Sequence, residues 1–229
     1  AARVDATWRM PIPKICVSQW LRNLALSFGN PADLVQHVPN GIDLDTFRVL
    51  RPIAEREPSI AMMYGAAPWK GAQDAFRALE IVRRSDPAIP VTMYGIWPKP
   101  PNLPKGVRYV RRPSRQRLVE EILNNSSVFL CPSWSEGWGL PGAEAMACGA
   151  ALVSTNNGGV RDYAAHGRNA LLSTPQDPEG LAGNLLTVLE DRALRTLLAE
   201  NGARSIQQFH WNASVPQFEA ALQLWTGQG

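Results

Sequence analysis

The fold class can be predicted from one stretch near the middle of the chain, Val128-Phe-Leu-Cys-Pro-Ser-Trp-Ser-Glu-Gly-Trp-Gly-Leu-Pro-Gly-Ala-Glu-Ala-Met-Ala-Cys-Gly149. Its first four residues are apolar and predict a strand that is buried on both faces. Gly137, Gly139 and Pro141 would each break a helix, so a loop follows the strand and a helix starts near Pro141. A strand, a glycine-rich loop and a helix in this order form the repeating unit of a parallel α/β sheet.

The same alternation runs through most of the chain. Short apolar runs are separated by amphipathic stretches such as residues 71–84, where Phe76, Leu79 and Val82 recur at helical spacing. The predicted strands cover residues 60–64, 91–94, 107–110, 128–131 and 151–154. The sequence therefore predicts an α/β fold, a Rossmann-like parallel sheet with helices on both faces.

The two ends of the chain follow other patterns. After Asn169 the sequence predicts helices only: one from Asp177-Pro178, a stop or kink at Asn201-Gly202, and a last helix from about Ser214 with Gln217 completing a capping box. At the other end a strand (14–18), a helix (19–28) and a strand (34–38) precede a proline-punctuated linker. One such unit cannot bury a core of its own, so we expect it to belong to a larger domain.

Composition excludes several classes of protein. The chain has 229 residues, 45% of them hydrophobic, and a net charge of +3 without a basic cluster, which argues for a globular protein and against nucleic acid as a partner. Three cysteines without CxxC spacing argue against structural zinc and disulfides, so we expect the protein to occupy a reducing compartment. We expect the side chains of Cys131 and Cys148 to be buried in the core. The sequence shows no charged-then-apolar leader and no apolar run of about 20 residues, so we expect a cytoplasmic location.

Candidate binding groups lie where the predicted strands end, because parallel α/β sheets bind ligands at that edge. The helix start near Pro141 would present N–H groups and its positive end to an anion such as phosphate. Lys70 follows the first strand and is equally explained as a phosphate-neutralising ammonium or a solvated lysine. Glu136 in the loop and Glu144 near the first helical turn are equally explained as ligand-holding groups or helix caps.

Two further features of these loops also have two explanations each. Gly158-Gly159, after the strand at 151–154, repeats the arrangement of glycines before a helix, which a tight turn alone explains better. Trp138 either stacks on a ligand or covers the core, and its position in a loop favours contact with a ligand.

The segment from Glu136 to Gly149 resembles the E-x7-E segment of retaining GT-B glycosyltransferases, the group 1, family 4-like enzymes that include glycogen and sucrose synthases and bacterial mannosyl- and glucosyltransferases. Further segments resemble this family in the same order. They are the last strand and helix of its N-terminal domain (14–21), its hinge (38–43), its loop lysine (70–71), and two segments after the E-x7-E stretch (157–159 and 166–172). The resemblance covers nearly the whole chain and points to the C-terminal, donor-binding half of such an enzyme.

The resemblance implies three parts. Residues 1–45 would be a remnant of the N-terminal acceptor domain with the hinge, residues 46–212 the nucleotide-sugar donor-binding domain, and residues 213–229 a C-terminal crossover helix. The full-length enzyme would transfer a hexose from a nucleoside-diphosphate sugar to a glycan, lipid or other acceptor in polysaccharide biosynthesis, without a metal or another cofactor. This chain alone is expected to be inactive and to self-associate through exposed apolar surface, and a peripheral membrane association of the full-length enzyme is left open.

The resemblance also implies roles for single residues. Glu136 would be the catalytic-site carboxylate that contacts the donor sugar, and Glu144 would hold the ribose of the nucleotide. The N–H groups of Gly139 and Leu140 would bind the pyrophosphate together with Lys70.

The resemblance also implies sugar contacts, and this chain departs from the family pattern at one position. Gly137 and Trp138 would contact the donor sugar. Family members commonly carry an arginine shortly before the loop lysine, where this chain has Gly65-Ala66-Ala67. Loss of such a charge-assisted contact costs about 1.5–3 kcal/mol, and Arg161 is the candidate for a substitute contact with phosphate.

Three other functions compete with this interpretation. The main alternative is a non-catalytic nucleotide-sugar-binding or regulatory module. A glycosidase would need Glu136 and Glu144 on either side of a glycosidic bond, and the anion site would then have no purpose. A nicotinamide-dependent dehydrogenase is disfavoured because no GxGxxG follows the first predicted strand.

Overall fold

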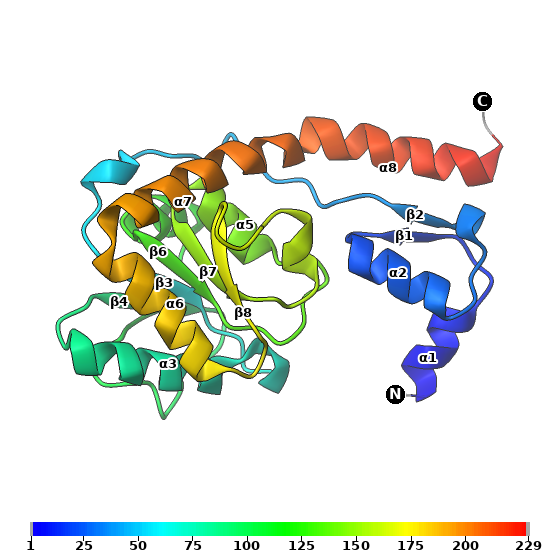
Figure 1. Ribbon diagram of the computed structural model, residues 1–229. Coiled ribbons are helices and arrows are strands. Elements are labelled where there is room, and N and C mark those ends of the chain that lie inside the picture. The colour runs from blue at the N-terminus through cyan, green and yellow to red at the C-terminus, as the bar shows by residue number, and fades with distance from the viewer. Residues whose placement is uncertain (1, 228–229) are drawn as a thin grey trace.

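The computed structural model describes residues 2–227 and contains one large parallel sheet (Figure 1). Its six strands lie in the order β5-β4-β3-β6-β7-β8, and every neighbouring pair is parallel. The predicted α/β fold with a Rossmann-like sheet is confirmed. The strands are β3 (Ile60–Met63), β4 (Val91–Gly95), β5 (Arg108–Arg111), β6 (Val128–Cys131), β7 (Ala151–Thr155) and β8 (Ala170–Ser173).

The edge strand β8 corrects the prediction that only helices follow Asn169. It pairs with β7, with Leu152 opposite Ala170 and Thr155 opposite Ser173. Ala170 and Leu171 are buried, whereas the last two residues of the strand are partly exposed. A short run with three apolar residues, Ala-Leu-Leu, cannot be told from a helical segment by its periodicity, and the prediction was wrong here.

Helices cover both faces of the sheet because alternate residues of each strand point to opposite sides. On one side, Ile60 and Met62 pack with α3 (Ala72–Ser85), α6 (Pro178–Glu190) and α7 (Arg192–Ser205). On the other side, Ala61 belongs to the core formed with α5 (Leu140–Ala147) and with the π-helical turn η4 (Leu118–Leu123), which continues the short α4 (Arg115–Arg117).

Helix α7 is continuous through Asn201-Gly202, so the predicted stop or kink at this position is wrong. Gly202 is buried, and a Cβ atom there would come within 3.2 Å of the Met146 side chain. The glycine therefore serves the close packing of α7 on α5, and the chain leaves the helix only at η6 (Ile206–Phe209).

The N-terminal segment forms the predicted strand-helix-strand unit beside the large sheet. It contains β1 (Lys14–Cys16), α2 (Gln19–Ser27) and β2 (Val35–His37), with β1 and β2 paired in parallel. An additional helix, α1 (Ala2–Arg9), precedes them. The fully buried apolar core of this unit consists of Cys16, Ala25 and Val35, which fits the expectation that the unit buries little on its own.

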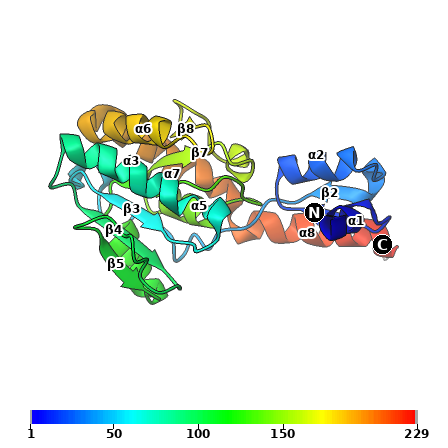
Figure 2. The same cartoon turned by 90° about the horizontal axis from the view of Figure 1, so that it is seen from below.

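Helix α8 (Trp211–Thr226) runs from the large sheet to the N-terminal unit, where it lies along β2 (Figures 1 and 2). Trp225 Nε1 donates a hydrogen bond to the Asp33 carbonyl, 3.1 Å away. The helix starts before the predicted Ser214, because the His210 imidazole accepts the Asn212 N–H and caps it. Gln217 donates to the Ala213 carbonyl, so the predicted capping box is wrong.

The interior contains a buried arginine and buried thiols. The guanidinium of Arg56 is buried and donates to five acceptors, four of them backbone carbonyls, in the segments 51, 123–126 and 148. Cys131 and Cys148 are buried free thiols, as predicted. No helix between residues 2 and 227 is long and apolar enough to cross a membrane.

Candidate functional site

The candidate site lies at the centre of the sheet, where β3 and β6 are neighbours. From β3 the chain adds strands outwards to β4 and β5, then returns to β6 and continues to β7 and β8 on the other side. The loops that leave β3 and β6 therefore diverge at the carboxyl edge of the sheet. Such a switch point is where open parallel sheets bind their ligands.

The loop after β3 carries Lys70 at the end of the short helix η3 (Pro68–Lys70). A Cβ atom on Gly65 would come within 2.7 Å of the Lys70 side chain, so the glycine leaves room for the lysine stem. The next residue, Gly71, has a φ of +66°, and a Cβ atom there would collide with the Pro132 carbonyl after β6. The two glycines thus bring the lysine against the loop that leaves the neighbouring strand.

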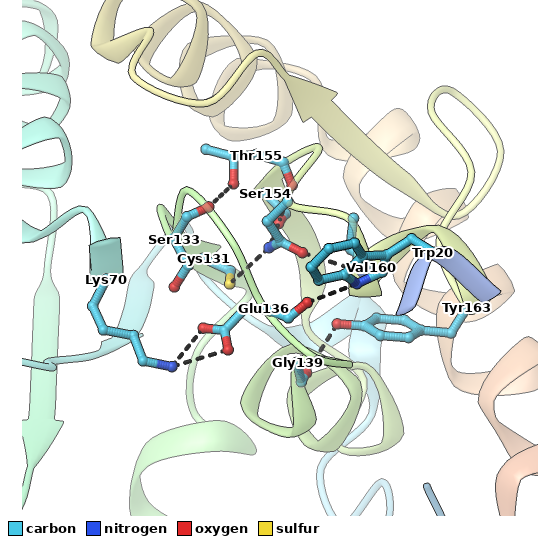
Figure 3. Close-up of polar contacts among 11 residues, drawn as sticks. Trp20, Lys70, Cys131, Ser133, Glu136, Gly139, Ser154, Thr155, Val160 and Tyr163 are labelled. Carbon is cyan, nitrogen blue, oxygen red and sulfur yellow. Dashed lines mark hydrogen bonds and ion pairs between the residues drawn. The ribbon is translucent and has the colours of Figure 1, made fainter. Parts of the chain in front are cut away.

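Lys70 and Glu136 form an ion pair across these two loops (Figure 3). The ammonium lies 2.7 Å from Oε1 and 2.9 Å from Oε2 of the carboxylate. Their side chains are 28% and 14% exposed, so the pair is neither fully solvated nor buried in the core. The structure therefore brings together Lys70 and Glu136, two of the residues predicted from the sequence to bind a ligand.

The loop from Glu136 leads into α5 through Gly139, which has a φ of +98° and precedes the first residue of the helix. The Tyr163 hydroxyl donates to the Gly139 carbonyl at 2.9 Å and holds this turn. Within residues 2–227, the N–H groups of residues 137–139 have no acceptor, and the N–H of Leu140 is a free donor of the first helical turn. Consecutive free N–H groups at a helix start attract an anion.

Trp138 does not line this site with its side chain. It is 2% exposed and packs against Tyr163 and Phe209, with ring centroids 4.9 and 5.3 Å away. The prediction that it stacks on a donor sugar is therefore wrong for its side chain. Gly137, in contrast, is exposed in the loop.

Glu144 is the fifth residue of α5, directly after the first helical turn, which agrees with the predicted position, and it is partly buried. Burial raises the pKa of its carboxyl to about 7, although the positive charge of Arg115 opposes the shift. Its carboxylate has no hydrogen-bond partner in the described part of the chain. Its ribose-binding role stays a prediction.

Arg161 is not part of the Lys70–Glu136 cluster. Its side chain is exposed, and Nε donates to Asn156 Oδ1 at 2.6 Å. It lines a separate pocket of about 580 Å³ together with His166 and Asp177, near the start of α6. A phosphate contact by Arg161 therefore stays a prediction that this arrangement does not favour.

One contact of the site was not predicted. The indole of Trp20, in the N-terminal unit, donates to the carbonyls of Glu136 and Gly137 at 2.9 and 3.3 Å. More than 110 residues separate the two segments in the sequence, and no local pattern pairs them. The sequence contains Trp20 within the segment 14–21 that resembles the family, but it does not show that Trp20 contacts the Glu136 loop.

A comparison with known protein families shows which family the chain belongs to. The description "Glycosyl transferases group 1" matches residues 45–205, well over half of the sequence. The chain belongs to this family. The glycosyltransferase resemblance is thereby confirmed, and the site described above lies inside the matched region.

Relatives of this group 1 glycosyltransferase are longer than the chain itself. The D-inositol 3-phosphate glycosyltransferase of Thermomonospora curvata is 28% identical over 238 residues, which cover 90% of this chain and 54% of the relative. Two solved structures have a similar fold: sucrose-phosphate synthase from Thermosynechococcus elongatus, with a TM-score of 0.77 and 23% identity, and Anabaena HepE in complex with UDP and glucose, with 0.80 and 19%. These matches cover 93% and 97% of this chain but 58% and 66% of those chains. At these identities the likeness establishes the fold alone.

Proposed function

We propose that this chain is the donor-binding part of a retaining glycosyltransferase that uses a nucleoside-diphosphate sugar. The observation that carries the proposal is the Lys70–Glu136 pair beside the free N–H groups at the start of α5. A diphosphate needs positive charge and N–H donors, and a sugar needs a carboxylate that accepts from its hydroxyls. Both kinds of group meet here, the ammonium on the loop after β3 and the carboxylate and N–H groups on the loop after β6.

The proposed division of labour follows from this arrangement. Lys70 and the N–H groups of Gly139 and Leu140 bind the pyrophosphate, while Glu136 faces the transferred sugar. Glu144 accepts hydrogen bonds from the ribose. Transfer proceeds without a metal, and the acceptor is a glycan or lipid held by a part of the full-length enzyme that lies outside this chain, so that the chain alone does not transfer sugar.

Calorimetric titration of the chain with UDP, GDP, ADP and the corresponding sugar nucleotides tests the proposal. HepE was solved with UDP, so UDP and UDP-glucose come first. We expect one nucleotide to bind and its sugar form to bind more tightly through Glu136. Failure of every nucleotide to bind at millimolar concentration would refute the donor site.

A second candidate function is favoured by one specific feature. Gly65-Ala66-Ala67 offers no side-chain charge before Lys70, and Arg161 is bound to Asn156 elsewhere. A nucleotide-sugar-binding module without catalysis would tolerate this weaker site. A transfer assay on the full-length gene product distinguishes the two functions, because a regulatory module would bind the donor and transfer nothing.

A further inference from the structure

A tryptophan from the N-terminal unit reaches the donor loop. The Trp20 indole N–H is shared between the carbonyls of Glu136 and Gly137, at 2.9 and 3.3 Å. Figure 3 shows the indole on one side of the Glu136 backbone and the carboxylate, with Lys70, on the other. The contact is therefore made to the loop's backbone and does not involve the carboxylate.

The ring also packs against the neighbouring glycine turn. A Cβ atom on Gly158 would come within 2.8–2.9 Å of three indole atoms, so only glycine leaves room for Trp20. Gly158 and Glu136 are bridged as in a short parallel ladder, and the Glu136 N–H donates to the Asn157 carbonyl at 3.0 Å. Trp20 thus rests on both loops at once.

Asp162 holds the helix that carries this tryptophan. Its carboxylate accepts the Gln19 N–H at 3.2 Å and caps the first turn of α2, where the Ser18 side chain makes no capping bond. The same carboxylate pairs with His37 Nε2 at 2.9 Å. Two elements of the N-terminal unit are therefore fixed to the residue that ends η5 (Gly159–Asp162), and the indole position follows from them.

The contact determines where the loop's N–H groups point. In a planar trans peptide the carbonyl and the next N–H point in opposite directions. With the carbonyls of Glu136 and Gly137 turned towards Trp20, the N–H groups of Gly137 and Trp138 are turned away from it. Of the two residues, Gly137 is exposed and lies close to the Gly139 and Leu140 N–H groups that the proposed function assigns to the pyrophosphate, whereas Trp138 is buried.

We propose that Trp20 is a positioning residue of the donor site, which orients the peptide between Glu136 and Gly137 so that the Gly137 N–H and the Glu136 carboxylate face the sugar diphosphate. This inference rests on the proposed function. It assigns the N-terminal unit a part in donor binding that its distance in sequence does not suggest.

The test compares Trp20→Phe, which keeps a ring over Gly158 but has no N–H, with Trp8→Phe as the matched control. Trp8 belongs to the same unit and stacks on Phe28 away from the loop. We expect Trp20→Phe to weaken UDP and UDP-glucose binding by about threefold to tenfold, as the loss of one shared hydrogen bond predicts. Trp8→Phe should leave the affinity unchanged.

A second measurement uses the unaltered protein and separates positioning from plain packing. A bound anion polarises the loop peptides and strengthens their carbonyls as acceptors, so the assigned Trp20 indole N–H resonance should move downfield on titration with UDP. The Trp8 resonance should stay in place. If nothing binds the unaltered chain, the proposed function fails. If UDP binds but Trp20→Phe binds equally well, or the Trp20 resonance does not move, only this inference is overturned.

Discussion

Replacement of Glu136 by glutamine should strengthen the binding of the bare nucleotide. In the free protein Glu136 holds Lys70 through two short contacts, 2.7 and 2.9 Å long. A nucleoside diphosphate has to draw Lys70 out of this pair before the ammonium can reach the pyrophosphate. The carboxylate is thus a competitor of the phosphate for the same cation.

The size of the effect follows from the exposure of the pair. Ion pairs between exposed side chains contribute about 0.2–1 kcal/mol, and with side chains 28% and 14% exposed this pair belongs at the upper end. Removal of the competing charge should therefore tighten UDP binding by roughly 1 kcal/mol, about fivefold. For UDP-glucose the variant also loses the charged acceptor for the sugar, which contributes about 1.5–3 kcal/mol. The preference for UDP-glucose over UDP should fall at least about tenfold.

Isothermal titration of both ligands at low salt measures the two changes together. Glu179→Gln is the control, since Glu179 pairs with Arg77 on an exposed surface, 2.7 Å apart. Higher salt should reduce the gain for UDP, because screening already weakens the native pair. Unchanged or weaker UDP binding in Glu136→Gln would refute the idea that the pair must open, and an unchanged preference would refute the sugar contact.

Three other properties can be measured on the same chain. Burial raises the pKa of Glu144 from 4.5 to about 7. Between pH 4.5 and about 7 the folded protein therefore keeps a proton on Glu144 that the unfolded chain has lost. The free energy of unfolding should fall by up to about 3 kcal/mol as the pH rises through this range. Urea unfolding at pH 5 and pH 8 should show this fall in the native chain and much less of it in Glu144→Gln; parallel pH profiles would contradict the burial argument. Arg56→Lys keeps the charge but cannot reach five acceptors, and should cost at least about 2 kcal/mol in denaturant unfolding, whereas Arg77→Lys should cost almost nothing. Helix α8 exposes an apolar stripe that includes Val215, Phe218 and Leu222, and Phe218, which is 46% exposed, lines a groove of about 390 Å³. This stripe should cause self-association in sedimentation, and Phe218→Glu should abolish it. A monodisperse native monomer would count against this prediction.

The central strands could be predicted because a strand that is buried on both faces consists almost entirely of apolar residues. All four residues of β6 are buried, and their sequence Val-Phe-Leu-Cys is uniformly apolar. The edge strand β8 is partly exposed, and its sequence Ala-Leu-Leu-Ser fits a helix as well as a strand. Exposure alone did not prevent prediction, since the edge strand β5 was predicted although Val110 is the one buried residue among its four.

The site was harder to predict because it depends on strand order. Lys70 and Glu136 meet since β3 and β6 are neighbours, although β4 and β5 lie between them in the chain. Local sequence gave each residue two equal explanations, and only the sheet arrangement brings them together. Trp138 was misjudged for a related reason: its loop position was visible, but its burial by Tyr163 and Phe209 depends on distant segments.

The shortage of cations in this site gives its backbone donors unusual weight. The segment 65–67 supplies no charged side chain, and Arg161 is engaged in another pocket, so Lys70 is the cation that the described site presents to a diphosphate. The remaining attraction has to come from the N–H groups at the start of α5, whose effect depends on direction because they are dipoles rather than full charges. A site that depends on directed dipoles needs its loop held from outside. The Trp20 contact provides this hold, and under the proposed function it makes donor binding depend partly on the N-terminal unit.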